Sequence, residues 1–331
     1  HLGRYHMTRK LMSRILVTGA VGQIGSELVP ELRSFYGSEN VVAGIHRRPP
    51  SDDLKESGPF ENVDVTSKSS IEKAIEKYDI NTIYHMAAIL SAVGERNPWL
   101  AWDVNVNGTY NILEVAREHD MVRIWLPSSI AVFGPETPCV NTPQETVLKP
   151  RTMYGLTKVT CELLGNYYFE KFGLDVRGVR YPGIISSETP PGGGTTDYAV
   201  EIFYEAIRHK HYTCFLREDT VLPMMYMPDC IKATVDLMNA DLSKLKHHSD
   251  FNLAAMSFSP RQLAEEIKKH IPDFTIEYKP DSRQAIADSW PNTIDDSAAR
   301  EEWGWNPSYD LATMTKDMLG KLRNRHKERC L

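Results

Sequence analysis

The sequence alternates two hydrophobic patterns from residue 13 to about residue 181. Short apolar runs rich in β-branched residues, such as 14–18 and 41–45, are followed by longer stretches with helical spacing, such as 23–36. Runs of the first kind are typical of strands buried on both faces of a parallel sheet. Strands that alternate with helices over this length predict right-handed βαβ units, and therefore an α/β fold with a doubly wound parallel sheet.

The same patterns place the other elements. Ser69 and Glu72 have the spacing of a capping box, which predicts that a helix begins at Ser69. After residue 185 the alternation stops at a loop rich in glycine and proline, 186–197, and shorter helices follow. We expect further strands at 62–64, 82–88, 122–126 and 174–181, and further helices at 69–77, 98–119, 154–172, 198–208, 228–239 and from 260.

Both ends of the chain are expected to lie outside the packed fold. Residues 1–12 show no periodicity and contain His6 followed by Met7, as a cloning junction does, so they are left out of the fold prediction. Residues 321–331 are expected to be frayed and solvated.

The composition excludes several classes of protein. With 41% hydrophobic and 25% charged residues the chain is typical of a globular protein, and its net charge of -6 gives no attraction to nucleic acid. No apolar run approaches the roughly 20 residues of a membrane helix, and there is no secretory signal. The 5 cysteines are far apart and form no C-x-x-C pair, which argues against a disulfide framework and structural zinc. We therefore expect a soluble protein of a reducing compartment, without metal, nucleic-acid or membrane partners.

A glycine-rich turn, residues 19–25, joins the first strand to the first helix. Glycine is required where a backbone approaches a pyrophosphate closely, and the helix N-terminus adds unpaired N–H groups and the positive end of a dipole. In this context the turn predicts dinucleotide binding. We therefore predict a dinucleotide-binding Rossmann domain at 13–185 and a smaller, mainly substrate-binding lobe at 186–331, from which segments such as 226–255 return to the Rossmann domain.

The residues after the second strand leave the choice of cofactor open. NAD-binding folds commonly place an acid there, about 20 residues beyond the glycines, against the ribose hydroxyls. Here the strand ends at Ile45 and is followed by His46, Arg47 and Arg48. The two arginines favour the 2′-phosphate of NADP, although they fit a solvated turn or stacking on adenine equally well.

Three residues form a candidate catalytic set. Tyr154 and Lys158 stand one turn apart on a predicted helix, where a cation beside a phenol stabilises the phenolate that a general base requires. Ser129 lies at the carboxyl end of a predicted buried strand, the edge at which open α/β sheets bind their ligands. Isolated Y-x-x-x-K spacing also arises by chance on helices, so the serine strengthens the hypothesis. His85 is expected to be an ordinary core histidine.

These motifs together resemble the extended branch of the short-chain dehydrogenase/reductase superfamily, over nearly the whole chain from residue 13. The resemblance implies a Rossmann fold in which Ser129, Tyr154 and Lys158 are catalytic. The implied cofactor site consists of Gly19, Gly22, Gln23, Ile24, Gly25, Arg47, Asp64, Val65, Met86, Ala87, Leu90, Asn105, Tyr154, Lys158, Tyr181 and Ile184.

Longer stretches are similar to a narrower family, the L-threonine 3-dehydrogenases of the short-chain type. The resemblance implies NAD as cofactor and oxidation of the C3 hydroxyl of L-threonine to 2-amino-3-oxobutanoate. The glycine-rich loop with Thr195 and Thr196 offers N–H and hydroxyl donors for a carboxylate. Substrate contacts are expected from Ser91, Ser129, Tyr154, Thr195 and Thr196. The stretches are 90–95, 180–186, 191–199, 222–226 and 289–291.

Two other functions stay open at this point. A nucleotide-sugar epimerase or dehydratase uses the same scaffold but needs a site for a diphosphate, for which the substrate lobe offers Arg217. A non-catalytic dinucleotide sensor would typically lack the tyrosine–lysine pair. The family also implies a homodimer formed by the helices at 98–119 and 154–172, in the mitochondrion if the source is eukaryotic and in the cytoplasm if it is bacterial.

Overall fold

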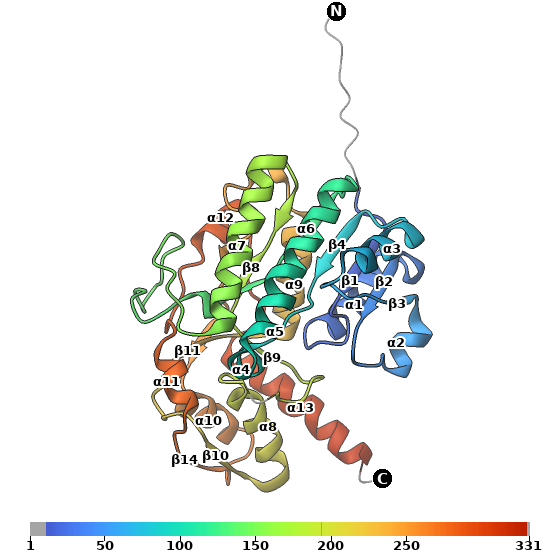
Figure 1. The fold of residues 1–331 in the computed structure, drawn as a ribbon. Coiled ribbons are helices and arrows are strands. Elements are labelled where there is room, and N and C mark those ends of the chain that lie inside the picture. Colours follow the sequence, from blue (N-terminus) through green and yellow to red (C-terminus); the bar gives the residue numbers. More distant parts are fainter. Residues whose placement is uncertain (1–10, 193, 330–331) are drawn as a thin grey trace, which may run out of the picture.

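The centre of the molecule is a six-stranded parallel sheet with the order β3-β2-β1-β4-β5-β7 (Figure 1). The computed structural model describes residues 11–192 and 194–329, so most of the predicted cloning remnant, one loop glycine and the last two residues of the tail lie outside the described residues. The strand order reverses between β1 and β4, which confirms the doubly wound fold. The strands are β1 Ile15–Thr18, β2 Val41–Ile45, β3 Phe60–Asn62, β4 Thr82–His85, β5 Arg123–Trp125 and β7 Val176–Arg177.

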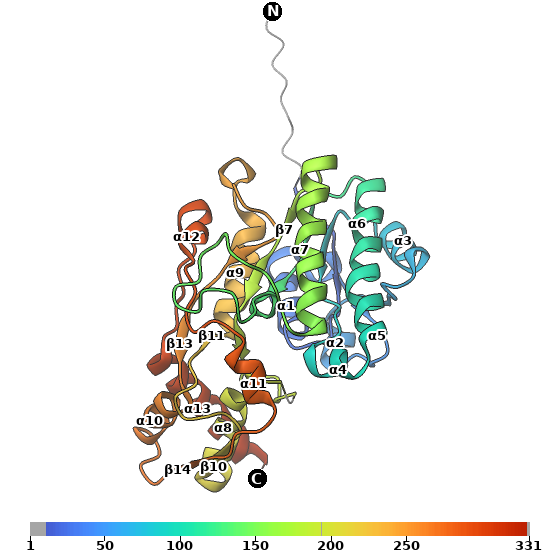
Figure 2. The ribbon, with the colours of Figure 1, turned by 60° about the vertical axis from the view of Figure 1, so that its left-hand side comes forward.

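Helices cover both faces of this sheet (Figure 2). Along β1, Ile15 and Val17 pack with α1 (Gly25–Tyr36) and α9 (Met227–Asn239), whereas Leu16 packs on the opposite face. That face carries α3, α6 and α7. Every β1 residue is fully or almost fully buried because both faces are covered, which explains its continuous apolar run. The three helices are α3 Lys68–Tyr78, α6 Gly108–Glu118 and α7 Met153–Phe172.

Two small sheets continue from the central one. The expected strand at 174–181 is split at Gly178, where a Cβ atom would lie 1.9 Å from the carbonyl oxygen of Leu126. The chain therefore changes sheets after β7, and β8 (Val179–Tyr181) pairs with β6 (Ser128–Ser129) and β12 (Phe251–Asn252). The third sheet has the order β13-β11-β9 and consists of β9 Gly183–Ile185, β11 Leu222–Tyr226 and β13 Met256–Phe258.

The C-terminal lobe has its own apolar core and lies below the sheet domain in Figures 1 and 2. The prediction of a frayed tail is wrong for α13 (Leu311–Arg329), because Met318 and Leu322 are buried in this core and Arg325 bonds the Ser187 carbonyl and Glu188. The other elements of the lobe are α8 Tyr198–His209, β10 His211–Cys214, α10 Pro260–Lys268, β14 Thr275–Tyr278 and α11 Arg283–Asp288, with α12 (Ser297–Trp303) against β12.

Two helix boundaries differ from prediction. The hydroxyl of Ser67, not Ser69, caps α3 by accepting from the Ser70 N–H. The helix expected at 98–119 is divided into α5 (Pro98–Trp102), a π-helical segment (Asp103–Asn107) and α6. Short elements that the patterns did not predict are α2 Asp52–Ser57, α4 Ser91–Arg96 and 3₁₀ turns at Ser38–Asn40, Ile130–Val132 and Leu242–Lys244.

Candidate active site

Two glycines of the turn, Gly19 and Gly25, are packed too closely for a side chain. Gly19 has φ 62°, and a Cβ there would lie 2.6 Å from the Ala87 nitrogen. A Cβ on Gly25 would lie 2.2 Å from the Gly19 carbonyl oxygen, whereas one on Gly22 would meet only that oxygen, at 3.2 Å. No side chain caps the first turn of α1, which begins after Ile24. Backbone that carries no side chain at these three glycines, beside an uncapped helix N-terminus, fits a bound pyrophosphate.

The ends of β1 and β4 are joined by Thr18, a residue that the sequence patterns did not single out. Its hydroxyl oxygen accepts from the N–H groups of Met86 (3.0 Å) and Ala87 (3.2 Å) and therefore donates its proton to Nδ1 of His85 at 2.8 Å. Nε2 of His85 then donates to the Thr109 hydroxyl at 3.2 Å. Burial, aided by the charge of Lys158, lowers the pKa of His85 to about 3. His85 is thus a neutral core histidine that fixes the strand ends.

Tyr154 and Lys158, in the first turns of α7, lie against the end of β6 that carries Ser129. Nζ of Lys158, a buried side chain, lies 5.6 Å from the centre of the Tyr154 ring and donates to the carbonyl of Pro127 at 3.1 Å. This bond attaches the first turns of α7 to the strand end that carries Ser129. The Ser129 hydroxyl accepts from the Ala131 N–H at 3.1 Å, which leaves its proton available to a ligand.

Behind this set lies a buried ion pair that sequence reasoning missed. Arg180 binds both carboxylate oxygens of Glu162 at 2.8 and 2.9 Å, and both side chains are 3% exposed. The Ser128 hydroxyl donates to the same carboxylate at 2.5 Å. Burial raises the pKa of Glu162, and the hydrogen bonds from Arg180 oppose that rise. Glu162 lies one turn after Lys158 on α7. A charged residue on a buried helix face is the sequence signal that could have indicated this ion pair.

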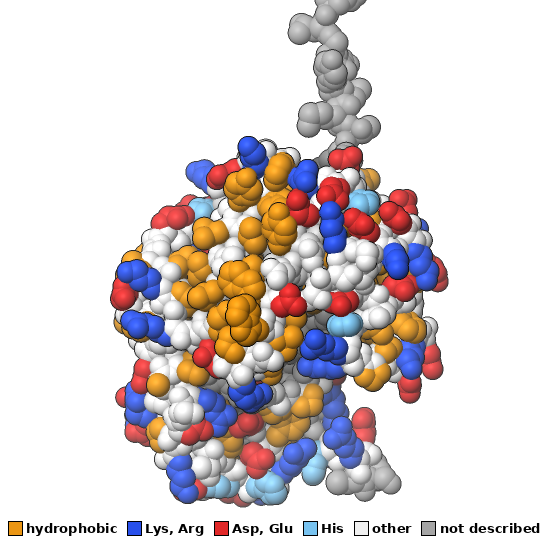
Figure 3. Space-filling view, in the orientation of Figure 1, with side chains coloured by type: hydrophobic (Ala, Val, Ile, Leu, Met, Phe, Trp, Pro, Cys, Tyr) orange, Lys and Arg blue, Asp and Glu red, His pale blue; other side chains and the backbone are white. Residues whose placement is uncertain are grey.

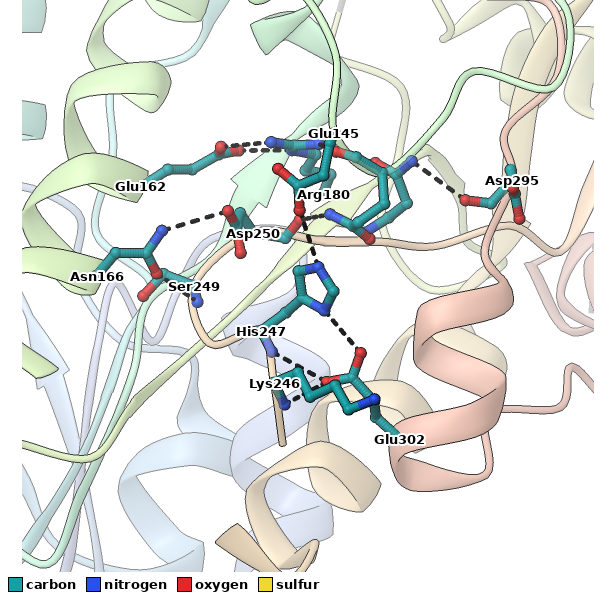
Figure 4. Close-up of polar contacts among 12 residues, drawn as sticks. Glu145, Glu162, Asn166, Arg180, Lys246, His247, Ser249, Asp250, Asp295 and Glu302 are labelled. Atoms are coloured by element: carbon teal, nitrogen blue, oxygen red, sulfur yellow. Dashed lines mark hydrogen bonds and ion pairs between the residues drawn. The ribbon is translucent and has the colours of Figure 1, made fainter. Parts of the chain in front are cut away.

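The ion pair belongs to a network that reaches α12 (Figure 4). Arg180 also donates to Asn252 at 3.0 Å, and Asn166 of α7 donates to Asp250 at 3.2 Å. His247 bridges Glu145 and Glu302 at 2.9 and 2.6 Å. Desolvation lowers the pKa of His247, but these carboxylates together raise it above its usual value. The network therefore joins α7, β8, β12, α12 and the segment around residue 145 behind the catalytic set.

Asn105, in the π-helical segment, shapes the chain after β4. Its amide accepts from the Ile89 N–H at 2.7 Å and donates to the Ile89 carbonyl at 2.9 Å and to Thr157 at 3.0 Å. Leu90, 59% exposed, is the N-cap of α4, which begins at Ser91. Met86, Ala87, Leu90 and Ser91 thus lie together beyond the end of β4. The hydrogen bonds of Asn105 to Ile89 hold the backbone of this segment in place.

The segment after β8 lies against the glycine turn. Gln23 donates to the carbonyl of Ile184 at 3.3 Å, which joins two parts of the predicted cofactor site. The side chain of Tyr181 is not available to that site, because its ring is buried and its hydroxyl is hydrogen-bonded to Thr234. In the predicted substrate loop, Thr196 approaches so closely that a Cβ on Gly183 would lie 2.8 Å from the Thr196 Cβ. The predicted substrate residue Thr195, just before it, is buried.

Part of the prediction for this loop is wrong. The N–H groups of Gly192 and Gly194 donate to the carboxylate of Asp197, at 2.8 and 2.7 Å, so they are not available to a substrate carboxylate. The start of the loop is held by Ser186, whose hydroxyl donates to Glu27 in the first turn of α1 at 2.7 Å. Burial raises the pKa of Glu27, and this hydrogen bond opposes the rise.

The other end of the predicted cofactor site lies beyond β2 and β3. Arg47 follows β2 and is exposed, and Val65 is buried against α6, where a Cβ on Gly108 would lie 2.8 Å from its Cγ2. Asp64 accepts from the Thr66 N–H and hydroxyl and lies 3.9 Å from Nε2 of His46. Partial burial raises the pKa of Asp64, but the bonds from Thr66 outweigh it and leave the pKa lower than usual.

Comparison with known proteins identifies the family. The model of the NAD dependent epimerase/dehydratase family matches residues 15–254. The chain belongs to this family. An uncharacterized epimerase/dehydratase of Staphylococcus haemolyticus is 51% identical over 319 residues, which are 96% of this chain and 100% of that protein. The glycine turn, in which a Cβ atom at Gly19 or Gly25 would collide with backbone, fits the NAD that the family uses.

Solved structures resemble the chain over almost its full length. An L-threonine dehydrogenase from Clostridium difficile is 54% identical with a TM-score of 0.93, covering 96% of this chain and 99% of that one. A monomeric L-threonine 3-dehydrogenase from a metagenome is 48% identical with a TM-score of 0.90, covering 94% and 99%. Within residues 11–192 and 194–329, no helix of this epimerase/dehydratase family member is long and apolar enough to span a membrane, and no three His, Cys, Asp or Glu side chains group as metal ligands.

Proposed function

We propose that this chain is an NAD-dependent L-threonine 3-dehydrogenase. The observation that carries the proposal is the packing of Tyr154 and Lys158 against the strand end that carries Ser129, together with a glycine turn that fits a pyrophosphate. The choice of substrate is supported by two L-threonine dehydrogenases that are 54% and 48% identical to this chain.

In this reaction Tyr154, as phenolate, accepts the proton of the C3 hydroxyl of L-threonine. Ser129 donates a hydrogen bond to the same oxygen, since its own acceptor position is already used by Ala131. Lys158 stabilises the phenolate by its charge and holds the nicotinamide ribose. The chemistry supplied by bound NAD is acceptance of the hydride that leaves C3. The product is 2-amino-3-oxobutanoate, a β-keto acid.

An epimerase or dehydratase acting on nucleotide sugars is the second enzymatic candidate, and one observation counts against it. Arg217, the residue considered for a diphosphate, forms ion pairs with Asp288 at 2.9 Å and Asp219 at 3.8 Å. An arginine that is already neutralised by two carboxylates is poorly suited to bind a diphosphate. The geometry therefore favours a small substrate.

The deciding experiment measures cofactor reduction with a panel of substrates. We expect NAD reduction with L-threonine, little with L-serine, and no turnover of UDP-glucose. Turnover of UDP-glucose without net cofactor reduction would favour the epimerase. Absence of turnover with every hydroxylated substrate, together with retained NAD binding, would favour the non-catalytic sensor and overturn the proposal.

We also propose that the enzyme is a homodimer. Apolar side chains gather over α6 and α7 on the face seen in Figure 3. In these two helices, Tyr110, Leu163 and Tyr167 are 47%, 63% and 52% exposed. Large exposed apolar patches mark interaction surfaces. Sedimentation should give twice the chain mass, and Leu163→Glu combined with Tyr167→Glu should give single chains. A single-chain mass for the wild type, the state named for the metagenomic relative, would contradict the dimer.

The cellular compartment that we propose depends on the organism from which the enzyme comes. We propose the cytoplasm for a bacterial source, such as that of the staphylococcal relative, and the mitochondrion for a eukaryotic one. Imaging of a tagged chain in its own cells would test this assignment.

A further inference from the structure

The end of β2 lies against the glycine turn. The N–H of Ala20, inside that turn, donates to the carbonyl of Gly44 at 3.1 Å. Gly44 is itself tightly enclosed, since a Cβ there would lie 2.9 Å from the Val17 carbonyl oxygen. The residues that follow β2 therefore emerge beside the backbone that fits the pyrophosphate. In a Rossmann fold this is the position that faces the adenosine ribose.

The backbone after β2 makes an unusual turn. The N–H of Arg48 donates to the carbonyl of His46 at 2.8 Å, which closes a γ-turn, and the central residue, Arg47, has φ 66°. A positive φ at a γ-turn is rare and strained for a residue other than glycine. Strained backbone is concentrated at ligand-binding sites, where it fixes side chains in place.

This turn carries more positive than negative charge. Arg47 and Arg48 are exposed, and neither guanidinium forms a hydrogen bond or an ion pair with another residue of the described chain, although the charge of Arg47 helps to lower the pKa of Asp64. The acid that would repel a second phosphate is replaced by Ile45. Asp64 is the carboxylate that faces His46 and Arg47, but one of its oxygens is held by Thr66, and its other oxygen lies 3.9 Å from Nε2 of His46. Two arginines with free planar donors outweigh this single acid, and such donors match a phosphate.

We infer that His46, Arg47 and Arg48 form a subsite for the 2′-phosphate of NADP, so that this protein binds NADP about as well as NAD. The inference extends the proposed function, which requires only NAD. It concerns nucleotide binding and can therefore be tested without turnover. Oxidation of L-threonine by a protein that rejects NADP would remove the subsite and leave the proposed function intact.

The experiment is calorimetric titration of the full chain with NADP and NAD, and with the nicotinamide-free fragments 2′,5′-ADP and ADP, at one fixed salt concentration. We expect the two dissociation constants in each pair to agree within about tenfold, because the hydrogen bonds of the arginines offset the desolvation of the extra phosphate. Raising the salt should weaken binding of the 2′-phosphorylated ligands more than that of the others.

Variants assign the effect to the turn. Arg47→Asn keeps a residue that tolerates positive φ but removes the guanidinium, and it should weaken NADP binding by about tenfold and leave NAD binding nearly unchanged. Arg47→Lys should restore part of the loss. Arg208→Gln, which removes an exposed arginine from α8, is the matched control and should change neither. NADP binding more than about tenfold weaker than NAD binding in the wild type, or an equal loss of both in Arg47→Asn, would overturn the inference.

Discussion

The two ends of the proposed cofactor site hold their polar groups in different ways. At the catalytic end, Lys158 is 6% exposed, and the Glu162–Arg180 pair behind it is bonded at every charged oxygen. At the end of β2, Arg47 and Arg48 are exposed and make no ion pair within the described chain. Chemistry requires groups held within a fraction of an ångström, whereas nucleotide binding tolerates side chains that adjust to the ligand. Substitutions should therefore affect stability and rate at the first end and affinity alone at the second.

The largest effect is expected from the buried ion pair. Glu162→Gln leaves Arg180 buried without a counter-charge, which should lower the free energy of unfolding by about 3–5 kcal/mol. Urea unfolding measures this directly. Glu145→Gln is the control, since its carboxylate is 81% exposed in its contact with His247 and should contribute at most about 1 kcal/mol. Equal, small effects of both variants would show that the buried Glu162–Arg180 pair contributes no more to stability than an exposed contact.

Removal of the active-site cation should act on rate more than on stability. Lys158→Met should lower kcat/KM for L-threonine by about 100-fold, a typical size for the loss of acid–base assistance. The KM for NAD should rise in the same variant, because the same ammonium is proposed to hold the nicotinamide ribose. Lys171→Met, at the exposed end of α7, should change neither quantity. Unchanged kcat/KM and KM for Lys158→Met would leave this lysine only a structural role, through its hydrogen bond to the Pro127 carbonyl.

The glycine turn lies between the two ends of the proposed cofactor site. A substitution at Gly22 should change the affinity for NAD and leave stability nearly unchanged. Gly22→Val should weaken NAD binding by about tenfold, or 1.4 kcal/mol, because its side chain would enter the space of the pyrophosphate. The fold should tolerate the change, since the new Cβ meets only the Gly19 carbonyl oxygen at 3.2 Å. Calorimetry and urea unfolding of the same sample separate affinity from stability. Unchanged affinity would remove Gly22 from the cofactor site.

The smallest effect is expected at the end of β2. Ile45→Asp should introduce the missing acid and weaken NADP binding by roughly three- to tenfold relative to NAD, with turnover nearly unchanged, because a carboxylate repels the 2′-phosphate. Ile45→Asn is the control without charge. Equal shifts in both variants would mean that the shape of the side chain, not its charge, discriminates between the cofactors.

The sequence predicted the fold because the central sheet is built from local patterns. Continuous apolar runs such as 14–18 and the glycine turn depend on burial and backbone space that neighbouring residues already reveal. Boundaries set by distant contacts were missed. Gly178 divides a strand because Leu126 lies against it, and α13 is ordered because its buried residues pack in the lobe. A local pattern carries no information on such contacts.

The site was predictable to a similar extent. The serine, tyrosine and lysine could be predicted as a catalytic set because their spacing on a strand end and a helix has a chemical reason, and their roles stay a prediction. The role of Asp197, which takes the N–H groups of Gly192 and Gly194, follows from a loop conformation that composition does not specify. The Glu162–Arg180 pair joins a helix to a later strand, so its two members have no common motif in the sequence.

The most direct test of this account compares chemistry and binding in Tyr154→Phe. The variant keeps the ring and the packing of α7 and loses the phenolic oxygen alone. We predict that NAD binds with an unchanged dissociation constant, while oxidation of L-threonine falls by about 10³-fold or more, within the range known for loss of a general base. Retained turnover in Tyr154→Phe, measured beside the wild type with both NAD and L-threonine saturating, would contradict the assignment of this edge of the sheet as the catalytic end.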